Sequence, residues 1–152
     1  MNKYNKYIEI QLVEAKTHHN IVQNCGDIHF LKGKIIEKSN NDKKIWYPEK
    51  VFNKMHIRVG ENNTVTEEMI EYMIDKADIK VNTIDNKTTI VHCVLPNGFT
   101  MVESSSCVDP ANYDELVGTK ICLDRIKEKL WGYLGFLLQT AINGFGDNNE
   151  CI

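Results

Sequence analysis

The chain has 152 residues, of which 42% are hydrophobic and 26% are charged. These fractions are typical of one globular domain and exclude a disordered chain. The formal net charge of −3 gives no general electrostatic attraction to nucleic acid phosphates. No apolar run has the length of a membrane span or of the apolar core of a signal peptide. We therefore expect a cytoplasmic protein without nucleic acid or membrane partners.

The cysteines and histidines show no metal-binding spacing. Five cysteines form an odd set without a Cys-x-x-Cys pair, and five histidines form no His-Glu-x-x-His motif. Without an export signal, this pattern predicts reduced thiols rather than a disulfide framework. We expect neither a bound metal nor a cofactor.

Lysines gather between residues 32 and 54, but acidic residues interrupt the cluster. Because Glu37, Asp42 and Glu49 lie among them, the pattern favours a solvated face over a phosphate-binding track. The lysines concerned are Lys32, Lys34, Lys38, Lys43, Lys44, Lys50 and Lys54.

Three strands and a short helix are predicted before residue 60. Tyr7–Ala15 alternates apolar and polar residues, which predicts a strand, and the polar His18-His19 pair is predicted to lie in the loop that follows. Pro48 suits the first turn of a helix over residues 48–55, where its missing N–H is not needed. The other predicted elements are a strand over Asp27–Ile36 with a bulge or bend at Gly33, a polar turn over Ser39–Lys44 and a short strand over Ile45–Tyr47.

The middle of the chain predicts one helix followed by three antiparallel strands. Gly60–Thr64 is a linker and a candidate boundary, and the acidic turn after Thr66 favours helix initiation. Apolar residues then recur at helical spacing, at Met69, Ile70, Met73, Ile74 and Ala77. The strands are Ile79–Ile84, Thr88–Leu95 and Phe99–Glu103, joined by turns at Asp85-Asn86 and at Pro96-Asn97-Gly98.

The last predicted element is a long helix. Asp109 is expected as its N-cap and Pro110 as its first residue. One apolar side is expected from Leu116, Val117, Ile121, Leu130, Leu134, Leu137 and Ala141. Beyond Leu130 apolar residues surround the helix, so we expect a homo-oligomer of at least two copies with this helix in its interface. Alternatively, Gly132, Gly135 and Gly144 break the helix into a folded-back pair.

Together these elements predict an α+β fold. It combines an antiparallel β-sheet with a short N-terminal helix, a middle helix and a long C-terminal helix or helical hairpin. Residues 1–60 are expected to form a β-rich segment with the short helix, and residues 61–152 an α+β module with the C-terminal helix. We expect the two to pack as one compact domain.

Residues 96–125 contain the most specific combination of features. A hairpin turn, a strand, a small-polar run and a helix start follow one another, which predicts that Phe99, the Ser104–Ser106 hydroxyls and a helix N-terminus lie close together. Such a surface suits a small ligand or an anion. Phe99 either stacks on a base or plugs the core beneath the turn. Arg125 either binds a phosphate, from across a dimer interface, or pairs with Asp124 or Glu128.

Catalysis is weakly supported by the sequence. A Cys107/His92 nucleophile is conceivable across the hairpin, but no Asn or Asp is placed to orient His92. The carboxylates of Glu103, Asp109 and Asp114 form no acid/base pair by spacing, and no phosphate-binding Gly-rich motif is present. We therefore expect a binding protein rather than an enzyme.

A further pattern runs through Glu67–Leu138, at Asn97–Phe99, Cys107–Pro110, Asn112–Asp114, Gly118, Lys120, Ile121 and Lys129–Leu134. In these residues the chain resembles a small phage protein family named after gene product 49 of an enterobacterial phage. The resemblance implies a phage or prophage origin, and hence action in the cytoplasm of a bacterial host.

The Asn-Gly-Phe to Cys-x-x-Pro pattern is also similar to the Thoeris anti-defence sponge proteins. Those proteins bind cyclic ADP-ribose-type immune signals without cleaving them. The resemblance implies that Phe99 stacks on adenine, that Asp109 contacts a polar edge in place of the family's common Asn, and that Arg125 binds a phosphate. The full set of expected ligand-binding residues is Phe99, Thr100, Ser104, Ser105, Asp109 and Arg125. The alternative function is a small interaction protein that binds a host or phage protein through its apolar C-terminal helix.

Overall fold

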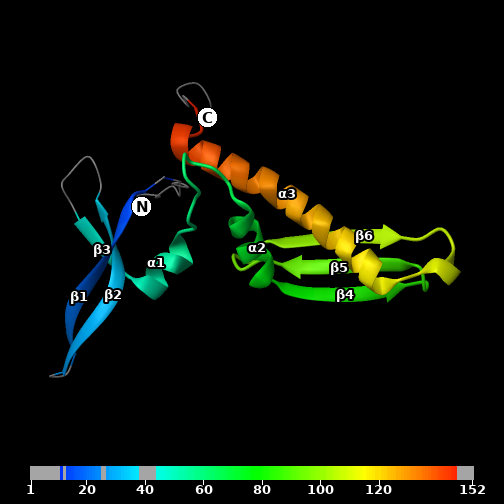
Figure 1. The fold of residues 1–152 in the computed structure, drawn as a ribbon, viewed down its shortest axis with the longest axis horizontal. Coiled ribbons are helices and arrows are strands. Elements are labelled where there is room, and N and C mark those ends of the chain that lie inside the picture. Colours follow the sequence, from blue (N-terminus) through cyan, green and yellow to red (C-terminus); the bar gives the residue numbers. More distant parts are fainter. Residues whose placement is uncertain (1–10, 12, 25–26, 38–43, 147–152) are drawn as a thin grey trace, which may run out of the picture. The chain divides into compact units, whose positions relative to one another are not determined.

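The computed structural model describes residues 11, 13–24, 27–37 and 44–146 and has an α+β fold, as predicted (Figure 1). Its described residues form two antiparallel three-stranded sheets. By its internal contacts the chain divides into two units: Met1–Arg58 with Gln139–Ile152, and Val59–Leu138. The predicted strand Tyr7–Ala15 and the predicted turn Ser39–Lys44 lie largely outside the described residues.

The first unit holds the sheet β1-β2-β3 and a short helix. Strands β1 (Ala15–Asn24), β2 (Asp27–Glu37) and β3 (Lys44–Pro48) pair in chain order, and α1 (Glu49–Met55) follows with Pro48 at its N-cap. The predicted loop around His18 and His19 is wrong, because both histidines lie within β1. The strand was missed because Lys16–His19 are all exposed, so β1 shows no apolar alternation there.

Gly33 does not form the predicted bulge. The β1–β2 register runs unbroken from Ala15↔Ile36 to Asn24↔Asp27 and includes Gly33. A Cβ at Gly33 would lie 2.3 Å from the carbonyl oxygen of Tyr47 and 2.6 Å from the indole of Trp46. The glycine therefore permits the close approach of β3 and its tryptophan to β2.

The second unit begins with α2 and continues into the sheet β4-β5-β6. Helix α2 (Glu67–Asp75) buries Met69, Ile70 and Met73, as its spacing predicts. Strands β4 (Asp78–Ile84), β5 (Thr88–Val94) and β6 (Thr100–Ser106) pair antiparallel in chain order. The small-polar run Ser104–Ser106 belongs to β6, so that strand is longer than the predicted Phe99–Glu103.

Both hairpin turns of this sheet have the predicted chemistry. Asp85 and Asn86 each adopt a φ of 52°, and the Lys87 N–H donates to the Ile84 carbonyl at 3.2 Å, so the two residues form a left-handed turn within the three-residue loop between Ile84 and Thr88. In the second turn Gly98, at φ 84°, donates its N–H to the Leu95 carbonyl at 2.8 Å. These local signals fix the register of β4, β5 and β6.

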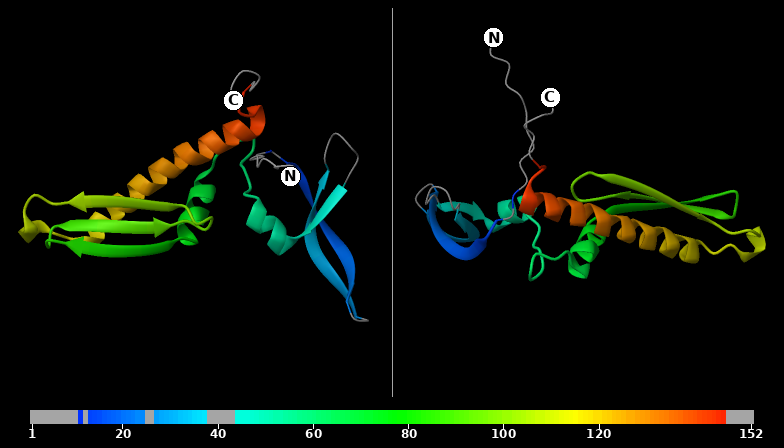
Figure 2. Two further views of the ribbon diagram at one scale, coloured as in Figure 1. Left: turned by 180° about the vertical axis from the view of Figure 1, so that it is seen from behind. Right: turned by 90° about the horizontal axis from the view of Figure 1, so that it is seen from above.

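Helix α3 (Glu115–Asn143) crosses one face of this sheet (Figures 1 and 2). Alternate residues of β5, namely Thr89, Val91 and Cys93, are fully buried, whereas Thr88, Ile90, His92 and Val94 are only partly buried. On α3, Cys122, Ile126, Leu130 and Leu134 are buried at every fourth position. Burial raises the pKa of the Cys93 and Cys122 thiols, which are therefore neutral core groups.

The apolar side predicted for the long helix is partly wrong. Leu116 is 80% exposed, and Val117, Ile121 and Leu137 are also exposed. The buried stripe is centred on Gly118, Cys122 and Ile126 instead. Since apolar residues surround this helix, its periodicity does not identify the face that meets the sheet. The helix runs without a break to Asn143 and ends before Gly144 at φ 71°, so the folded-back pair is not formed.

The predicted start of the long helix is also wrong. Asp109 and Pro110 begin a short 3₁₀-helix, η1 (Pro110–Asn112), in which Asp109 Oδ1 accepts from the Ala111 N–H at 2.9 Å. The cap of α3 is Asp114, whose Oδ1 accepts from the N–H groups of Leu116 at 2.8 Å and Val117 at 3.2 Å. The sequence contains two caps five residues apart, and only the second one leads into the long helix.

Replacing Asp114 by alanine is expected to destabilise the protein by about 1 kcal/mol, because two N–H groups of the first turn of α3 lose their acceptor. Denaturant unfolding of Asp114→Ala measures the loss. Asp109→Ala is the matched control and should cost less, because its carboxylate caps only the three-residue η1. A larger loss in Asp109→Ala would contradict the assignment of Asp114 as the main cap.

Candidate functional site

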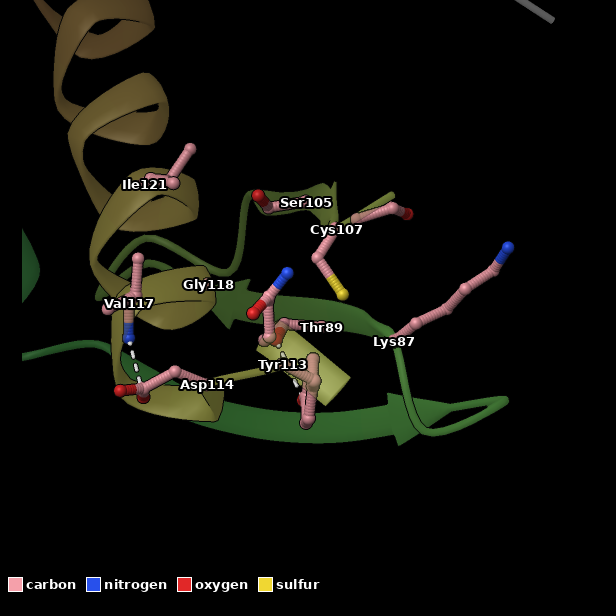
Figure 3. A pocket seen from close by; sticks show the side chains of 11 residues that line it. Lys87, Thr89, Ser105, Cys107, Tyr113, Asp114, Val117, Gly118 and Ile121 are labelled. Atoms are coloured by element: carbon pink, nitrogen blue, oxygen red, sulfur yellow. Dashed lines mark hydrogen bonds between the residues drawn. The ribbon is translucent and has the colours of Figure 1, made fainter. Parts of the chain in front are cut away.

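A pocket of about 160 Å³ opens where η1 and the first turns of α3 meet the ends of β5 and β6 (Figure 3). Val117, Gly118 and Ile121 of α3 form an apolar wall, and the strand ends and η1 supply polar groups. Its other lining residues are Lys87, Thr89, Ser105, Ser106, Cys107, Asn112, Tyr113 and Asp114.

Tyr113 and Gly118 set the geometry of this pocket. The Tyr113 hydroxyl lies 2.7 Å from Thr83 Oγ1 and 2.9 Å from Thr89 Oγ1, which ties η1 to the sheet. Gly118 lies so close to β5 that a Cβ would be 2.2 Å from Thr89 Oγ1. The sequence signal for this arrangement is a glycine in the first turn of a helix, where glycine is otherwise unfavourable.

A second feature is a row of α3 side chains that meets the edge strand β6. Arg125, Lys129 and Tyr133 are spaced by four residues and therefore lie on one side of the helix. We call these three residues the Arg125–Tyr133 row. Arg125 Nη1 donates to the Ser104 carbonyl at 2.7 Å, Lys129 pairs with Glu103, and the ring of Tyr133 meets that of Phe99.

The two cations of this row differ in their availability. Lys129 is engaged by the carboxylate of Glu103, a hydrogen bond that raises the pKa of the lysine. Arg125 is exposed and donates to a neutral carbonyl. Among the described residues no carboxylate lies within ion-pair distance of Arg125, so neither predicted pairing with Asp124 or Glu128 is formed. Its charge is therefore available to an anion.

Phe99 lies immediately before β6 and leaves half of its ring exposed. Its relative exposure is 50%, and its ring meets Tyr133 edge to face, with centroids 5.7 Å apart and an interplanar angle of 81°. Tyr133 is itself 49% exposed. Two half-exposed rings held at a fixed angle form a platform on which a flat ligand can stack.

The structure separates the residues that the sequence placed on one surface. Phe99 and Thr100 stand at the start of β6, whereas Ser104 and Ser105 stand near its end. Five residues of extended strand separate Phe99 from Ser104, roughly 17 Å. Asp109 lies beyond β6 as the cap of η1. The expected close cluster is wrong because Ser104–Ser106 continue the strand rather than turning back.

The Arg125–Tyr133 row extends from the pocket to the aromatic platform of Phe99 and Tyr133. Ile121, one turn before Arg125, lines the pocket together with Ser105, and Arg125 contacts Ser104. The pocket and the platform thus lie along one side of α3. Lys129 and Tyr133 were not predicted as site residues, although their four-residue spacing from Arg125 is the signal that groups them.

The Cys107/His92 pair considered from the sequence as a nucleophile and its base is not brought together in the structure. His92 pairs with Val102, near the middle of β6, and Cys107 Sγ donates to the Asp109 carbonyl at 3.1 Å. Among the residues that the structure describes, no group of three His, Cys, Asp or Glu side chains could hold a metal ion. No helix in this part of the chain is long and apolar enough to span a membrane.

The family model described as "Phage protein (N4 Gp49/phage Sf6 gene 66) family" matches residues 65–142, just over half of the chain. The chain belongs to this phage protein family. The matched residues include α2, the sheet β4-β5-β6 and all of α3 except its last residue, so they contain both the pocket and the Arg125–Tyr133 row. No curated protein and no solved structure matches the chain.

Proposed function

We propose that this phage family member binds a small nucleotide signal along the Arg125–Tyr133 row and sequesters it without cleaving it. The observation that carries this proposal is the pairing of a half-exposed aromatic platform with an exposed arginine that donates to a neutral carbonyl and has no carboxylate within ion-pair distance among the described residues. A base stacks on Phe99, and a phosphate binds the guanidinium of Arg125 in a bidentate contact.

The spacing along α3 fits such a ligand. Eight residues separate Tyr133 from Arg125, which corresponds to about 12 Å along the helix axis. This is the order of length of a nucleotide with two phosphates. Ser105 and Asp109, near the pocket, then provide acceptors for a sugar hydroxyl or an amino group.

The ligand requires a second copy of the chain in this proposal. The pocket of about 160 Å³ is smaller than the roughly 300–1,000 Å³ of sites that enclose a small molecule. The exposed apolar residues of α3, including Leu116 and Phe136, supply an interface that would complete the enclosure. Sequestration in the cytoplasm of the bacterial host would withdraw the signal from an immune receptor.

Incubation with a nucleotide panel, followed by heat denaturation and mass spectrometry of the released ligand, tests this function. The panel contains cyclic ADP-ribose isomers and cyclic dinucleotides. Intact ligand released in stoichiometric amount is the expected result. A linear product would instead indicate an enzyme, and the absence of any thermal shift across the panel would overturn nucleotide binding.

A second candidate is a protein-binding function of α3. The observation that favours it is the exposure of aromatic and aliphatic side chains around the helix: Trp131 is 42% exposed, Phe136 67% and Leu116 80%. Such residues are enriched at protein interfaces. Both candidates use Leu116 and Phe136, but Trp131 lies on a different side of α3 from the Arg125–Tyr133 row, because it is two residues, or about 200°, from Tyr133.

A further inference from the structure

The charges of this chain are strongly segregated between its two ends. Residues 1–58 contain eleven Lys and Arg and six Asp and Glu, a net charge of +5, whereas residues 59–152 contain seven and fifteen, a net charge of −8. The charge boundary lies at the division between Arg58 and Val59; the first unit also includes Gln139–Ile152, whose two acidic residues reduce its net charge to +3 and leave the second unit at −6. The net charge of −3 hides this segregation, and the expectation of no nucleic acid partner rested on that net charge.

The β1–β2 ribbon carries cations on both of its faces. In the observed register His19 lies opposite Lys32 and Thr17 opposite Lys34, so His19, Lys32 and Lys34 share one face. Lys16 and His18 alternate with them and lie on the other face. All four residues Lys16–His19 are exposed, so both faces of β1 are open to solvent at this point.

Helix α1 adds a second row of cations. Lys50 and Lys54 are four residues apart and both exposed, so they are neighbours on one side of the helix. Like charges at this spacing destabilise a helix slightly. Among the described residues, no carboxylate lies within ion-pair distance of Lys16, Lys34, Lys50 or Lys54. Lys34 donates instead to Thr17 Oγ1 at 2.7 Å, whereas Lys32 is paired with Glu49 at 2.8 Å.

From this placement we infer that the described residues of β1, β2 and α1 form a binding surface for single-stranded nucleic acid, recognised through its phosphates. Lys16 and Lys34 lie on opposite faces of the ribbon, and neither is within ion-pair distance of a carboxylate among the described residues. Cations on both faces of a narrow ribbon suit a flexible linear polyanion that wraps around it. A membrane surface or a rigid acidic protein would meet one face only.

The surface is independent of the proposed nucleotide site. Its residues all lie before the matched family region, whereas Phe99 and Arg125 lie within it. Binding through phosphates is insensitive to base sequence and falls steeply with salt. The side chains of Tyr47, Phe52 and His56 pack against one another in the same unit.

Fluorescence anisotropy of a labelled 20-nucleotide oligo-dT with the full chain tests the inference, at 50 and 200 mM NaCl. The expected result is binding at 50 mM that weakens by roughly tenfold or more at 200 mM. Lys16→Gln/Lys54→Gln should weaken binding at 50 mM by roughly tenfold and make the log–log salt slope shallower by about 1.4, since two phosphate contacts are lost.

The matched control is Lys76→Gln/Lys120→Gln, which makes the same change in net charge on exposed lysines of the second unit. It should leave oligo-dT binding unchanged. Equal weakening in both variants, or no binding at 50 mM, would overturn the inference. Binding to phosphatidylglycerol vesicles without binding to oligo-dT would also overturn the inference. The same holds if the Lys16→Gln/Lys54→Gln variant changes its oligomeric state but keeps its affinity for oligo-dT.

Discussion

Replacing Phe99 by alanine is expected to weaken nucleotide binding by roughly five- to 150-fold. Stacking of one base on an aromatic ring contributes about 1–3 kcal/mol, and each 1.4 kcal/mol corresponds to a factor of ten in the dissociation constant. The ring is half exposed, so the variant should fold, and the backbone contacts of the turn do not need the side chain: Leu95 donates its N–H to the Phe99 carbonyl at 2.8 Å. Isothermal titration calorimetry measures the loss.

Two further variants make this result specific. Phe99→Trp retains a stacking surface and should keep most of the affinity. Trp131→Ala removes an aromatic ring of similar exposure from the other side of α3 and should leave nucleotide binding unchanged. If Trp131→Ala removes the affinity while Phe99→Ala does not, the binding site lies on the side of α3 assigned here to protein interaction.

The parts of the fold that the sequence predicted are those with local causes. Asp85-Asn86 and Gly98 adopt the positive φ values that their turns require, so β4, β5 and β6 follow from turn chemistry. Helix α2 was also predictable, since one clear apolar face of Met69, Ile70 and Met73 meets the core. In these segments a few neighbouring residues determine the structure.

The parts that were not predictable depend on contacts far apart in the sequence. β1 has exposed residues on both faces at Lys16–His19, so no alternation of apolar and polar residues there predicts a strand. Apolar residues occur on nearly all sides of α3, so the sequence does not show which side is buried. Only the contact with the sheet determines that side. The buried face includes Gly118, whose missing side chain lets the helix approach Thr89 of β5.

The same distinction applies to the candidate site. Phe99, Ser104, Ser105 and Arg125 were chosen from the sequence, and the structure brings Ser104 and Arg125 into contact. It separates Phe99 from them because hydroxyl residues, which resemble a loop in the sequence, extend β6. Tyr133 joins the platform only because α3 lies along β6, a tertiary relation that no local pattern contains.

Replacing Gly118 by alanine should destabilise the protein by about 1–3 kcal/mol, although alanine is the better helix former by about 1 kcal/mol. The added methyl would lie 2.2 Å from Thr89 Oγ1 and 2.7 Å from Thr89 Cβ. Thr89 is fully buried and its hydroxyl is held by Tyr113, so the threonine has no room to move away. Either α3 moves off β5 or the Thr89–Tyr113 hydrogen bond breaks. Thermal and denaturant unfolding measure the change.

Gly132→Ala makes the same substitution in the same helix with the opposite expected sign. No atom lies within 4 Å of a Cβ built at Gly132, and the position is exposed. Only the difference in helix propensity then applies, so the free energy of unfolding of this variant should rise by up to about 1 kcal/mol. If both variants stabilise the protein, the close packing of α3 on β5 is not formed in solution. If Gly118→Ala alone destabilises it, the glycine sets the distance between α3 and the sheet, and with it the shape of the pocket beside Tyr113.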